Sequence, residues 1–139
     1  MKHRVFIGSS KESEEIAITV SEFLSGDYEC VVWNNGFFGI NKGTYESLAK
    51  NAVAFDYAIY IGGKDDLSVR LKSRKVKISP RDNVYLEFGL YAGILSPARS
   101  YFLIDEKCKI ASDLLGITVL RYSNSQSLRD CCAQIKEKM

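Results

Sequence analysis

Five short apolar runs, separated by longer stretches of helical periodicity, constrain the fold of this 139-residue chain more than any other feature. The runs are rich in β-branched and aromatic residues and have the length of buried strands. We predict strands at residues 4–10, 28–33, 56–63, 101–104 and 118–122. The periodic stretches predict helices at 14–24, 44–54, 80–95 and 125–138, and a short helical turn at 112–116. Strands that alternate with helices favour an α/β fold.

An α/β fold of this pattern is an open, five-stranded parallel sheet with helices on both faces. Because crossovers between parallel strands are right-handed, few topologies remain, and we predict the flavodoxin-like strand order 2-1-3-4-5. The segments 34–43 and 64–78 are predicted to be a glycine-rich loop and a polar connection. In such sheets ligands bind beyond the carboxyl ends of the strands, at the switch between the first and third strands.

Length and composition indicate one cytoplasmic domain, residues 1–139. Hydrophobic residues make up 46% of the chain, and no apolar run approaches a membrane span. The first four residues lead straight into an apolar strand, so we expect no signal peptide. The formal net charge is only +2, which gives no indication of nucleic-acid binding. The basic run at 70–77 is interpreted as a solvated loop, with a self-association surface as the alternative.

Cysteine and histidine usage restricts the chemistry. The chain has four cysteines without a CxxC motif and a single histidine, His3, so a zinc site is hard to assemble. We expect reduced thiols and no metal. A lone histidine also argues against Ser-His-Asp and Cys-His mechanisms. Any catalysis is therefore expected to rest on carboxylates.

Glu87 is the single acidic or basic residue between Val84 and Leu95. This stretch is apolar on nearly every side, which predicts a buried helix, and Ser79-Pro80 before it is a helix-start signal. A carboxylate in such a helix needs a partner or a site, because burying it alone is costly and raises the pKa of a carboxyl group. Glu87 is thus either a candidate active-site acid or one half of a buried ion pair with a lysine or arginine.

Three loops at the same edge carry groups suited to a nucleotide. Ser9 and Ser10 offer hydroxyls and backbone N–H groups before a helix, which suits an anion; serines that cap the helix are the alternative. Trp33 and Phe37 supply flat faces for stacking on a base or a cationic ring such as nicotinamide, with ordinary packing as the alternative. Asp65, followed by a second aspartate, could hold ribose hydroxyls or a cation, or lie in a solvated turn.

Taken together, these segments resemble the TIR-like domains of bacterial antiphage effectors of the CBASS or Pycsar type, including the TIR domain of TIR–STING fusions. The most specific part is Arg-Asp-Asn-Val-Tyr-Leu-Glu-Phe-Gly-Leu at 81–90. Val-Phe-Ile-Gly-Ser-Ser at 5–10, Trp33, the aspartate pair at 65–66 and Ser-Asp-Leu-Leu-Gly at 112–116 also match. The resemblance spans residues 4–122, most of the chain.

The resemblance implies a flavodoxin-like TIR fold and an NAD+ glycohydrolase (NADase) that cleaves the nicotinamide–ribose bond, with Glu87 as the catalytic residue. NAD+ is the substrate, and no further cofactor is implied. Arg81 and Asn83 would orient the glutamate. The serines at 9–10 would lie near phosphate or ribose, and the two aromatic residues near a ring.

The same resemblance implies an effector that stays silent until a STING-like cyclic-nucleotide sensor domain acts on it, in cis or in trans. Oligomers or filaments formed through TIR contacts would then complete the site. The chain would be a TIR domain excised from such a sensor or partnered with one. Three alternatives stay open. One is a non-catalytic TIR-like assembly module, and another is an enzyme like nucleoside deoxyribosyltransferases, which also use a glutamate near a sugar. The third is a phosphate- or flavin-binding relative of flavodoxin. Hydrolysis to ADP-ribose and cyclisation are both open as outcomes.

Overall fold

The computed structural model describes residues 2–33, 52–63, 66–69, 76–79, 82–108 and 118–139 of the chain. Its centre is a five-stranded parallel sheet in the order β2-β1-β3-β6-β7. The strands of this sheet are β1 (His3–Ser9), β2 (Tyr28–Trp33), β3 (Tyr57–Gly62), β6 (Ser100–Asp105) and β7 (Thr118–Tyr122). Since β6 and β7 are its fourth and fifth strands, the predicted order 2-1-3-4-5 is confirmed.

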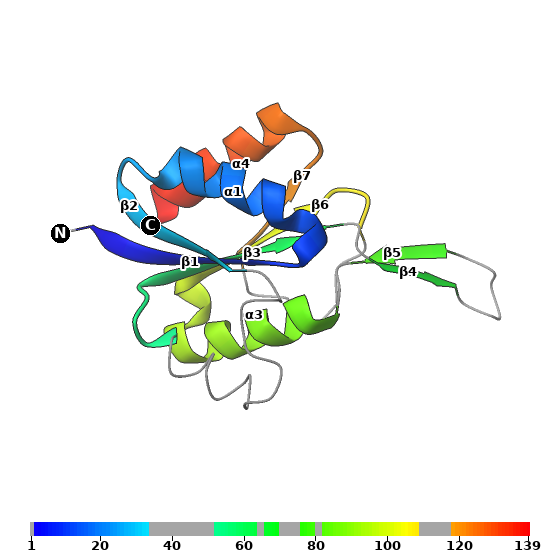
Figure 1. Cartoon of the computed structure of the whole chain (residues 1–139), viewed down its shortest axis with the longest axis horizontal. Coiled ribbons are helices and arrows are strands. Elements are labelled where there is room, and N and C mark those ends of the chain that lie inside the picture. The colour runs from blue at the N-terminus through cyan, green and yellow to red at the C-terminus, as the bar shows by residue number, and fades with distance from the viewer. Residues whose placement is uncertain (1, 34–51, 64–65, 70–75, 80–81, 109–117) are drawn as a thin grey trace.

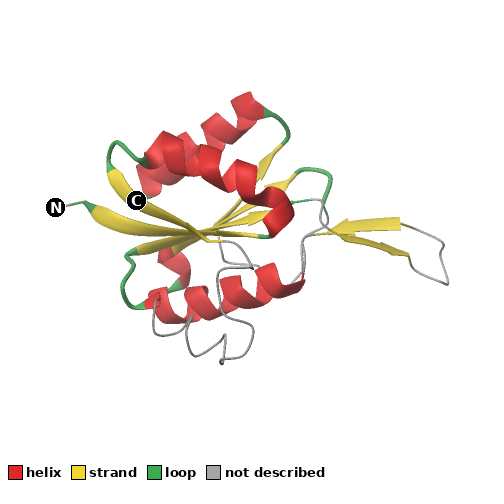
Figure 2. Ribbon diagram, viewed as in Figure 1, coloured by secondary structure: helices red, strands yellow, loops and turns green. Residues whose placement is uncertain are grey.

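Helices cover both faces of the sheet (Figures 1 and 2). They are α1 (Glu14–Leu24) and α4 (Ser125–Lys138) on one face and α3 (Asp82–Leu95) on the other, with the short 3-10 helices η1 (Lys11–Ser13) and η2 (Pro97–Arg99). α4 begins where the sequence predicts. The Asn124 side chain accepts a hydrogen bond from the Ser127 backbone N–H at 2.9 Å, and the Ser127 hydroxyl accepts one from the Asn124 N–H. This reciprocal cap fixes the first turn.

The described part of the core forms two clusters, one on each face of the sheet. Val5 and Ile7 of β1 belong to the cluster under α1 and α4, while Phe6 between them belongs to the cluster under α3. The same alternation holds in β3, where Ile59 and Tyr60 face opposite sides. All these side chains are wholly buried. Strands covered on both faces need apolar residues at every position, which explains the continuous apolar runs of the sequence.

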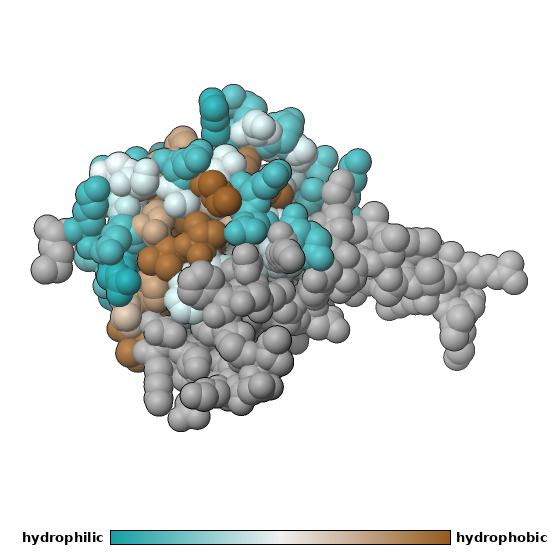
Figure 3. All heavy atoms as spheres, viewed as in Figure 1, coloured by the Kyte–Doolittle hydropathy of each residue, from teal (hydrophilic) through white to brown (hydrophobic). Residues whose placement is uncertain are grey.

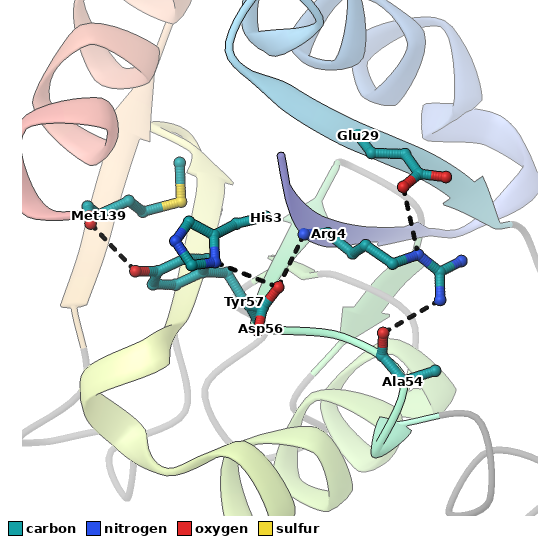
Figure 4. A network of polar contacts seen from close by, with 7 residues as sticks. All are labelled: His3, Arg4, Glu29, Ala54, Asp56, Tyr57 and Met139. Atoms are coloured by element: carbon teal, nitrogen blue, oxygen red, sulfur yellow. Dashed lines mark hydrogen bonds and ion pairs between the residues drawn. The ribbon is translucent and has the colours of Figure 1, made fainter. Parts of the chain in front are cut away.

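Polar contacts at the amino edge of the sheet fix the starts of β1 and β3 (Figure 4). The Arg4 backbone N–H donates to Asp56 Oδ2 at 2.9 Å, and His3 Nδ1 lies 3.4 Å from the same oxygen. The hydrogen bond from the Arg4 N–H is the main reason that the pKa of Asp56 lies below its ordinary value. The Tyr57 hydroxyl donates to the Met139 carbonyl oxygen at 3.0 Å, which ties the end of α4 to the start of β3.

The prediction of a helix buried nearly all round is wrong for the described side chains of α3. Phe88, Tyr91 and Ala92 are buried, whereas Gly93 and Ile94 are exposed. A helix that packs one side on a sheet turns its other side outward, and glycines and single apolar residues are tolerated there. The composition of the stretch did not show which residues would form that outer side.

A second difference is a β-hairpin of β4 (Asp66–Val69) and β5 (Val76–Ser79), inside the segment predicted to be a polar connection. The strands are antiparallel, and the register pairs apolar residues with each other, as in Leu67 with Ile78. Alternation of apolar and polar residues is typical of strands, but the dense positive charge of the segment hid it. The hairpin projects away from the five-stranded sheet (Figure 1).

Some predicted elements lie outside the described residues. These are the glycine-rich loop at 34–43, the turn at 112–116, and the helix at 44–54 apart from residues 52–54. Within the described part of the chain, none of the helices has the length and apolarity needed to cross a membrane.

Candidate functional site

The carboxyl ends of β1, β2 and β3 meet at one edge of the sheet, where the sequence predicts the site. These strands end at Ser9, Trp33 and Gly62. Gly8 of β1 pairs in register with Trp33 on one side and with Tyr60 on the other. Because α3 leads through η2 into the start of β6 at the amino edge, the first turn of α3 lies at the carboxyl edge.

Aromatic rings pack between α3 and the sheet. This aromatic cluster consists of Phe6, Tyr60, Phe88, Tyr91 and Phe102, all wholly buried. The closest pair joins β1 to α3, with 4.3 Å between the ring centroids of Phe6 and Tyr91. Phe88 meets Phe102 edge-on at 4.9 Å and Tyr60 at 5.7 Å, which joins α3 to β6 and β3. Aromatic pairs each contribute about 0.5–1.5 kcal/mol beyond the area that they bury.

Glu87 lies in the first half of α3, one residue before Phe88 and one turn before Tyr91. Because the aromatic cluster holds α3 against three strands, the backbone of Glu87 has a fixed place relative to the carboxyl edge. Asn83 lies one turn before Glu87 and on the same side of the helix. The structure thus brings Asn83, in the first turn of α3, to the predicted edge, and places the backbone of Glu87 one turn further along the α3 face.

Gly8 has a packing role that the sequence did not indicate. A Cβ added there would lie 2.5 Å from Tyr60 Cε1 and 2.9 Å from Phe6 Cε1. Both rings are wholly buried, so neither has open space to turn into. The glycine of the Gly-Ser-Ser segment therefore allows the aromatic cluster to close beneath α3.

Ser9 is 1% exposed, and its hydroxyl has no hydrogen-bond partner among the described residues. It pairs in register with Ile61, which belongs to the cluster under α1 and α4, so Ser9 lies on that face and not on the α3 face. An unsatisfied buried hydroxyl costs about 1–3 kcal/mol, which a ligand or an ordered water would offset. Ser10 is also wholly buried, and its carbonyl oxygen accepts from the Ser13 N–H at 3.1 Å to begin η1.

Trp33 is half-buried at the end of β2, with its ring centroid 5.6 Å from that of Phe6. This contact extends the aromatic cluster toward the carboxyl edge, so Trp33 approaches the site from the same face as α3. Three other predicted site residues lie outside the described part of the chain: Phe37, Asp65 and Arg81. Of the described ones, the tryptophan and the glutamate helix share a face, and the Ser9 hydroxyl lies on the other.

Sequence reasoning missed the residues that fix the end of β3. Cys108 Sγ donates to the Gly63 carbonyl oxygen at 3.3 Å, and the Tyr122 hydroxyl donates to the Gly62 carbonyl oxygen at 3.5 Å. Arg121 Nη1 in turn donates to the Cys108 carbonyl oxygen at 3.0 Å. These contacts join segments far apart in the chain, so no local pattern reveals them. A glycine pair directly after an apolar strand was the one available signal.

The thiols and the metal-binding side chains show little reactive chemistry in the described ranges. No group of three His, Cys, Asp or Glu side chains there comes together to hold a metal ion. All four cysteines are free, and burial raises the pKa of Cys30 and of Cys132 to about 11. These two thiols are therefore protonated at neutral pH and are weak nucleophiles.

Among the described residues, two grooves line the face of α1 and α4. The first, of about 330 Å³, opens at the ends of β6 and β7 and is lined by Glu15, Ile16, Thr19, Asp105, Tyr122, Ser123, Asn124, Ser125 and Leu128. The second, of about 310 Å³, is lined by Thr19, Glu22, Phe23, Leu128, Arg129 and Cys132. Neither of these two grooves is lined by a predicted site residue.

Strand order, layers and site position define an open α/β domain of the flavodoxin type. The solved structure of the diflavin flavoprotein A3 from Nostoc sp. has this fold, with a TM-score of 0.55 over 99% of this chain and 91% of that chain. The two sequences are 9% identical, so the likeness shows the fold alone.

The sequence comparisons identify the family. Residues 4–124 match the family described as CAP12/Pycsar effector protein, TIR domain, and the chain belongs to this family. This confirms the resemblance to TIR-like domains of bacterial antiphage effectors. Such a match covers most of the chain, from β1 to the start of α4.

The curated relatives are named CD-NTase-associated protein 12 or Pycsar effector protein. CD-NTase-associated protein 12 from Flavobacterium daejeonense is 43% identical over 94% of this chain and 43% of that protein. The protein of the same name from Sphingobacterium faecium is 37% identical over 100% of this chain and 42% of its own length. The Pycsar effector protein XpPycTIR from Xanthomonas perforans is 31% identical over 96% of this chain and 46% of its own length. The chain therefore spans less than half the length of these relatives.

Proposed function

We propose that this domain is an NAD+ glycohydrolase, the effector domain of a bacterial antiphage protein, with Glu87 as its catalytic residue. The observation that carries the proposal is the place of Glu87, in the first half of a helix that starts at the carboxyl edge of the sheet and is held on the sheet by the aromatic cluster. Membership of the CAP12/Pycsar TIR family supports it. Ligands of open α/β sheets bind at this edge, beside the first and third strands.

The reaction needs one carboxylate. When the bond between ribose C1′ and the nicotinamide nitrogen breaks, its electron pair stays on the ring, and nicotinamide leaves as a neutral molecule. The ribose becomes oxocarbenium-like, and a negative charge beside it stabilises that cation. Water then adds at C1′ and loses a proton, which gives ADP-ribose; an internal nucleophile would give a cyclic product. Leaving-group protonation is not needed, so a single acidic residue suffices.

The other site residues have proposed roles in binding. Trp33, with Phe37, would stack on a ring, since Trp33 reaches the edge from the α3 face. Ser9 and Ser10 would contact phosphate or ribose at the end of β1 through their backbone N–H groups, because the Ser9 hydroxyl lies on the face of α1 and α4. Asp65 would hold ribose hydroxyls.

Two residues that flank Glu87 have proposed positioning roles. Asn83 lies one turn before Glu87 on α3, a spacing at which side chains of a helix meet. Arg81 directly precedes that helix in the sequence. Their side chains would orient the carboxylate of Glu87 toward the ribose.

We further propose that the domain acts in the cytoplasm under the control of a cyclic-nucleotide sensor, STING-like, in cis or in trans. Support comes from the family and from the relatives, named CD-NTase-associated protein 12 and Pycsar effector protein. Activation would occur through self-association that completes the site. A rate that rises more steeply than protein concentration is the expected sign of this step.

Product analysis tests the proposal. Concentrated protein is incubated with NAD+, and nicotinamide, ADP-ribose and any cyclic product are separated. We expect nicotinamide release matched by one ribose-containing product. Deoxynucleosides are supplied in a parallel reaction; base exchange on them without NAD+ cleavage would indicate a deoxyribosyltransferase. Assembly of the protein without turnover of either substrate would indicate a non-catalytic module.

A further inference from the structure

β2 is an edge strand of the sheet and, within the described part of the chain, pairs with β1 alone. Its outer side presents backbone N–H and C=O groups that no described strand takes up. Every residue of β2 is half-buried or exposed, whereas β1 from Val5 and β3 from Ala58 are buried to their ends. The exposure of β2 therefore comes from its open edge.

β2 lacks the features that commonly protect a strand edge. Its sequence, Tyr-Glu-Cys-Val-Val-Trp, contains no proline and a single charged residue, Glu29. That charge is paired, since Arg4 Nε lies 3.6 Å from Glu29 Oε2 (Figure 4). Figure 3 shows hydrophobic side chains gathered over the region where β2 lies in Figure 1. An open apolar edge of this kind pairs readily with another strand.

The opposite edge of the sheet is different. β7 carries the exposed Arg121, whose Nη1 donates to the carbonyl oxygens of Glu106 at 3.4 Å and Cys108 at 3.0 Å. These contacts hold a positive charge on the edge strand, and a charge on an edge strand disfavours strand addition. Of the two edges, β2 is the one suited to pairing.

We propose that two copies of this chain associate through β2, antiparallel and strand to strand, so that their sheets become continuous across a two-fold axis. The proposal rests on the self-association included in the proposed function and names its surface. A second copy is the occupant that fits, because one self-complementary patch satisfies both open edges at once. The two strands have equal length, and the Arg4–Glu29 pair leaves each edge without an unpaired charge.

The register of this pairing is limited. Side chains that oppose each other in antiparallel strands lie on the same face of the sheet. A two-fold axis perpendicular to the sheet must therefore pass beside one residue of β2, which then opposes its own copy in the other chain. An axis at Glu29 would oppose two carboxylates, which is unfavourable. An axis at Cys30 opposes Glu29 with Val31, and an axis at Val31 opposes Glu29 with Trp33. Both central registers bring the two Cys30 β-carbons within about 4.5–8 Å.

A short thiol crosslinker tests the geometry on the 139-residue chain. Cys30 is half-buried, while Cys108, Cys131 and Cys132 are 2–4% exposed, so the crosslinker reaches Cys30 first. Alkaline conditions and a long reaction time favour the crosslink, because burial raises the pKa of the Cys30 thiol to about 11. We expect a crosslinked dimer whose yield rises with protein concentration, because a strand pair is a small interface, and its loss in Cys30→Ser.

Two valines give a matched pair of variants. Val31 on β2 and Val119 on β7 are both half-buried residues of edge strands that pack against the cluster under α3. Val31→Lys and Val119→Lys are therefore expected to lower the stability of the fold by similar amounts, and thermal unfolding measures this. We expect Val31→Lys to lose the dimer in crosslinking and in sedimentation, and Val119→Lys to keep it.

Each outcome decides the proposal. Sedimentation as a monomer at all concentrations, a dimer that persists in Val31→Lys, or equal loss in Val119→Lys overturns it. A complex with the edge strand of another protein, formed in place of the dimer, also overturns it. NAD+ cleavage is measured separately. A dimer that does not cleave NAD+ would support the β2 interface and contradict the proposed glycohydrolase activity. Cleavage by a strictly monomeric protein would support the activity and contradict the interface.

Discussion

Gly8 provides a sharp stability prediction, because Gly8→Ala adds one methyl group where two rigid rings already meet. The new Cβ would lie 2.5 Å and 2.8 Å from Tyr60 Cε1 and Cζ, and 2.9 Å from Phe6 Cε1. Contacts this short cannot persist, so Tyr60 or Phe6 must move. Each ring also touches Tyr91, at 5.9 Å and 4.3 Å between centroids, so the movement disturbs the packing of α3.

The magnitude follows from two opposing effects. Overpacking a well-packed core costs about 1–3 kcal/mol. Alanine in place of glycine within a strand returns about 0.5–1 kcal/mol. The midpoints of these ranges predict that Gly8→Ala lowers the free energy of unfolding by about 1 kcal/mol, and their extremes limit the loss to about 2.5 kcal/mol.

The assay is urea unfolding, with Gly26→Ala as the matched control. A Cβ at Gly26 meets nothing within 4 Å, so the same substitution is expected to leave stability unchanged or slightly increased. The midpoint should fall in Gly8→Ala with an unchanged slope. Equal stability of the two variants would refute the claim that Gly8 is needed for the closure of the aromatic cluster.

Three further predictions follow from local structure. Gly93→Ala on the outer side of α3, where a Cβ meets nothing within 4 Å, should raise the free energy of unfolding by up to about 1 kcal/mol; a loss would mean that this side is covered. Because the Arg4 N–H lowers the pKa of Asp56, the stabilisation is fully present above the ordinary value of 3.8 and is lost as the pH falls through the lowered pKa. Asp56→Asn should reduce this acid sensitivity in urea titrations, and an unchanged pH dependence would contradict it. Asn124→Ala removes the cap of α4 and should cost about 1 kcal/mol by thermal unfolding, with no change expected if Ser127 caps the helix alone.

The three central strands of the sheet, β1, β3 and β6, were predictable because most of their side chains are buried on both faces. Phe6 and Ile7 point to opposite clusters, so β1 has no polar position between Val5 and Gly8. α4 was predictable for another reason, since its start depends on the local cap of Asn124 and Ser127. The sequence therefore predicts features that depend on neighbouring residues or on burial on both faces.

The wrong predictions concern features that depend on tertiary packing. Which side of α3 faces outward depends on the sheet beneath it, and the stretch around Ile94 is too uniformly apolar to show this. The hairpin of β4 and β5 was hidden by the charges between its apolar residues. At the site, an isolated acid in an apolar stretch indicated Glu87. The hydrogen bond from Cys108 to Gly63 joins two separate loops, and no sequence pattern encodes it.

The central claim is that Glu87 carries NAD+ cleavage. Its most direct test is the rate of nicotinamide release by Glu87→Gln beside the wild-type chain, both at high and equal protein concentration. Glu22→Gln, which removes an exposed carboxylate on α1, is the matched control. We predict a rate about 100- to 1,000-fold lower in Glu87→Gln and unchanged in Glu22→Gln, because a carboxylate that faces the developing cation is worth several kcal/mol. Release by Glu87→Gln at the wild-type rate, or no release by the assembled wild-type protein, would contradict the claim.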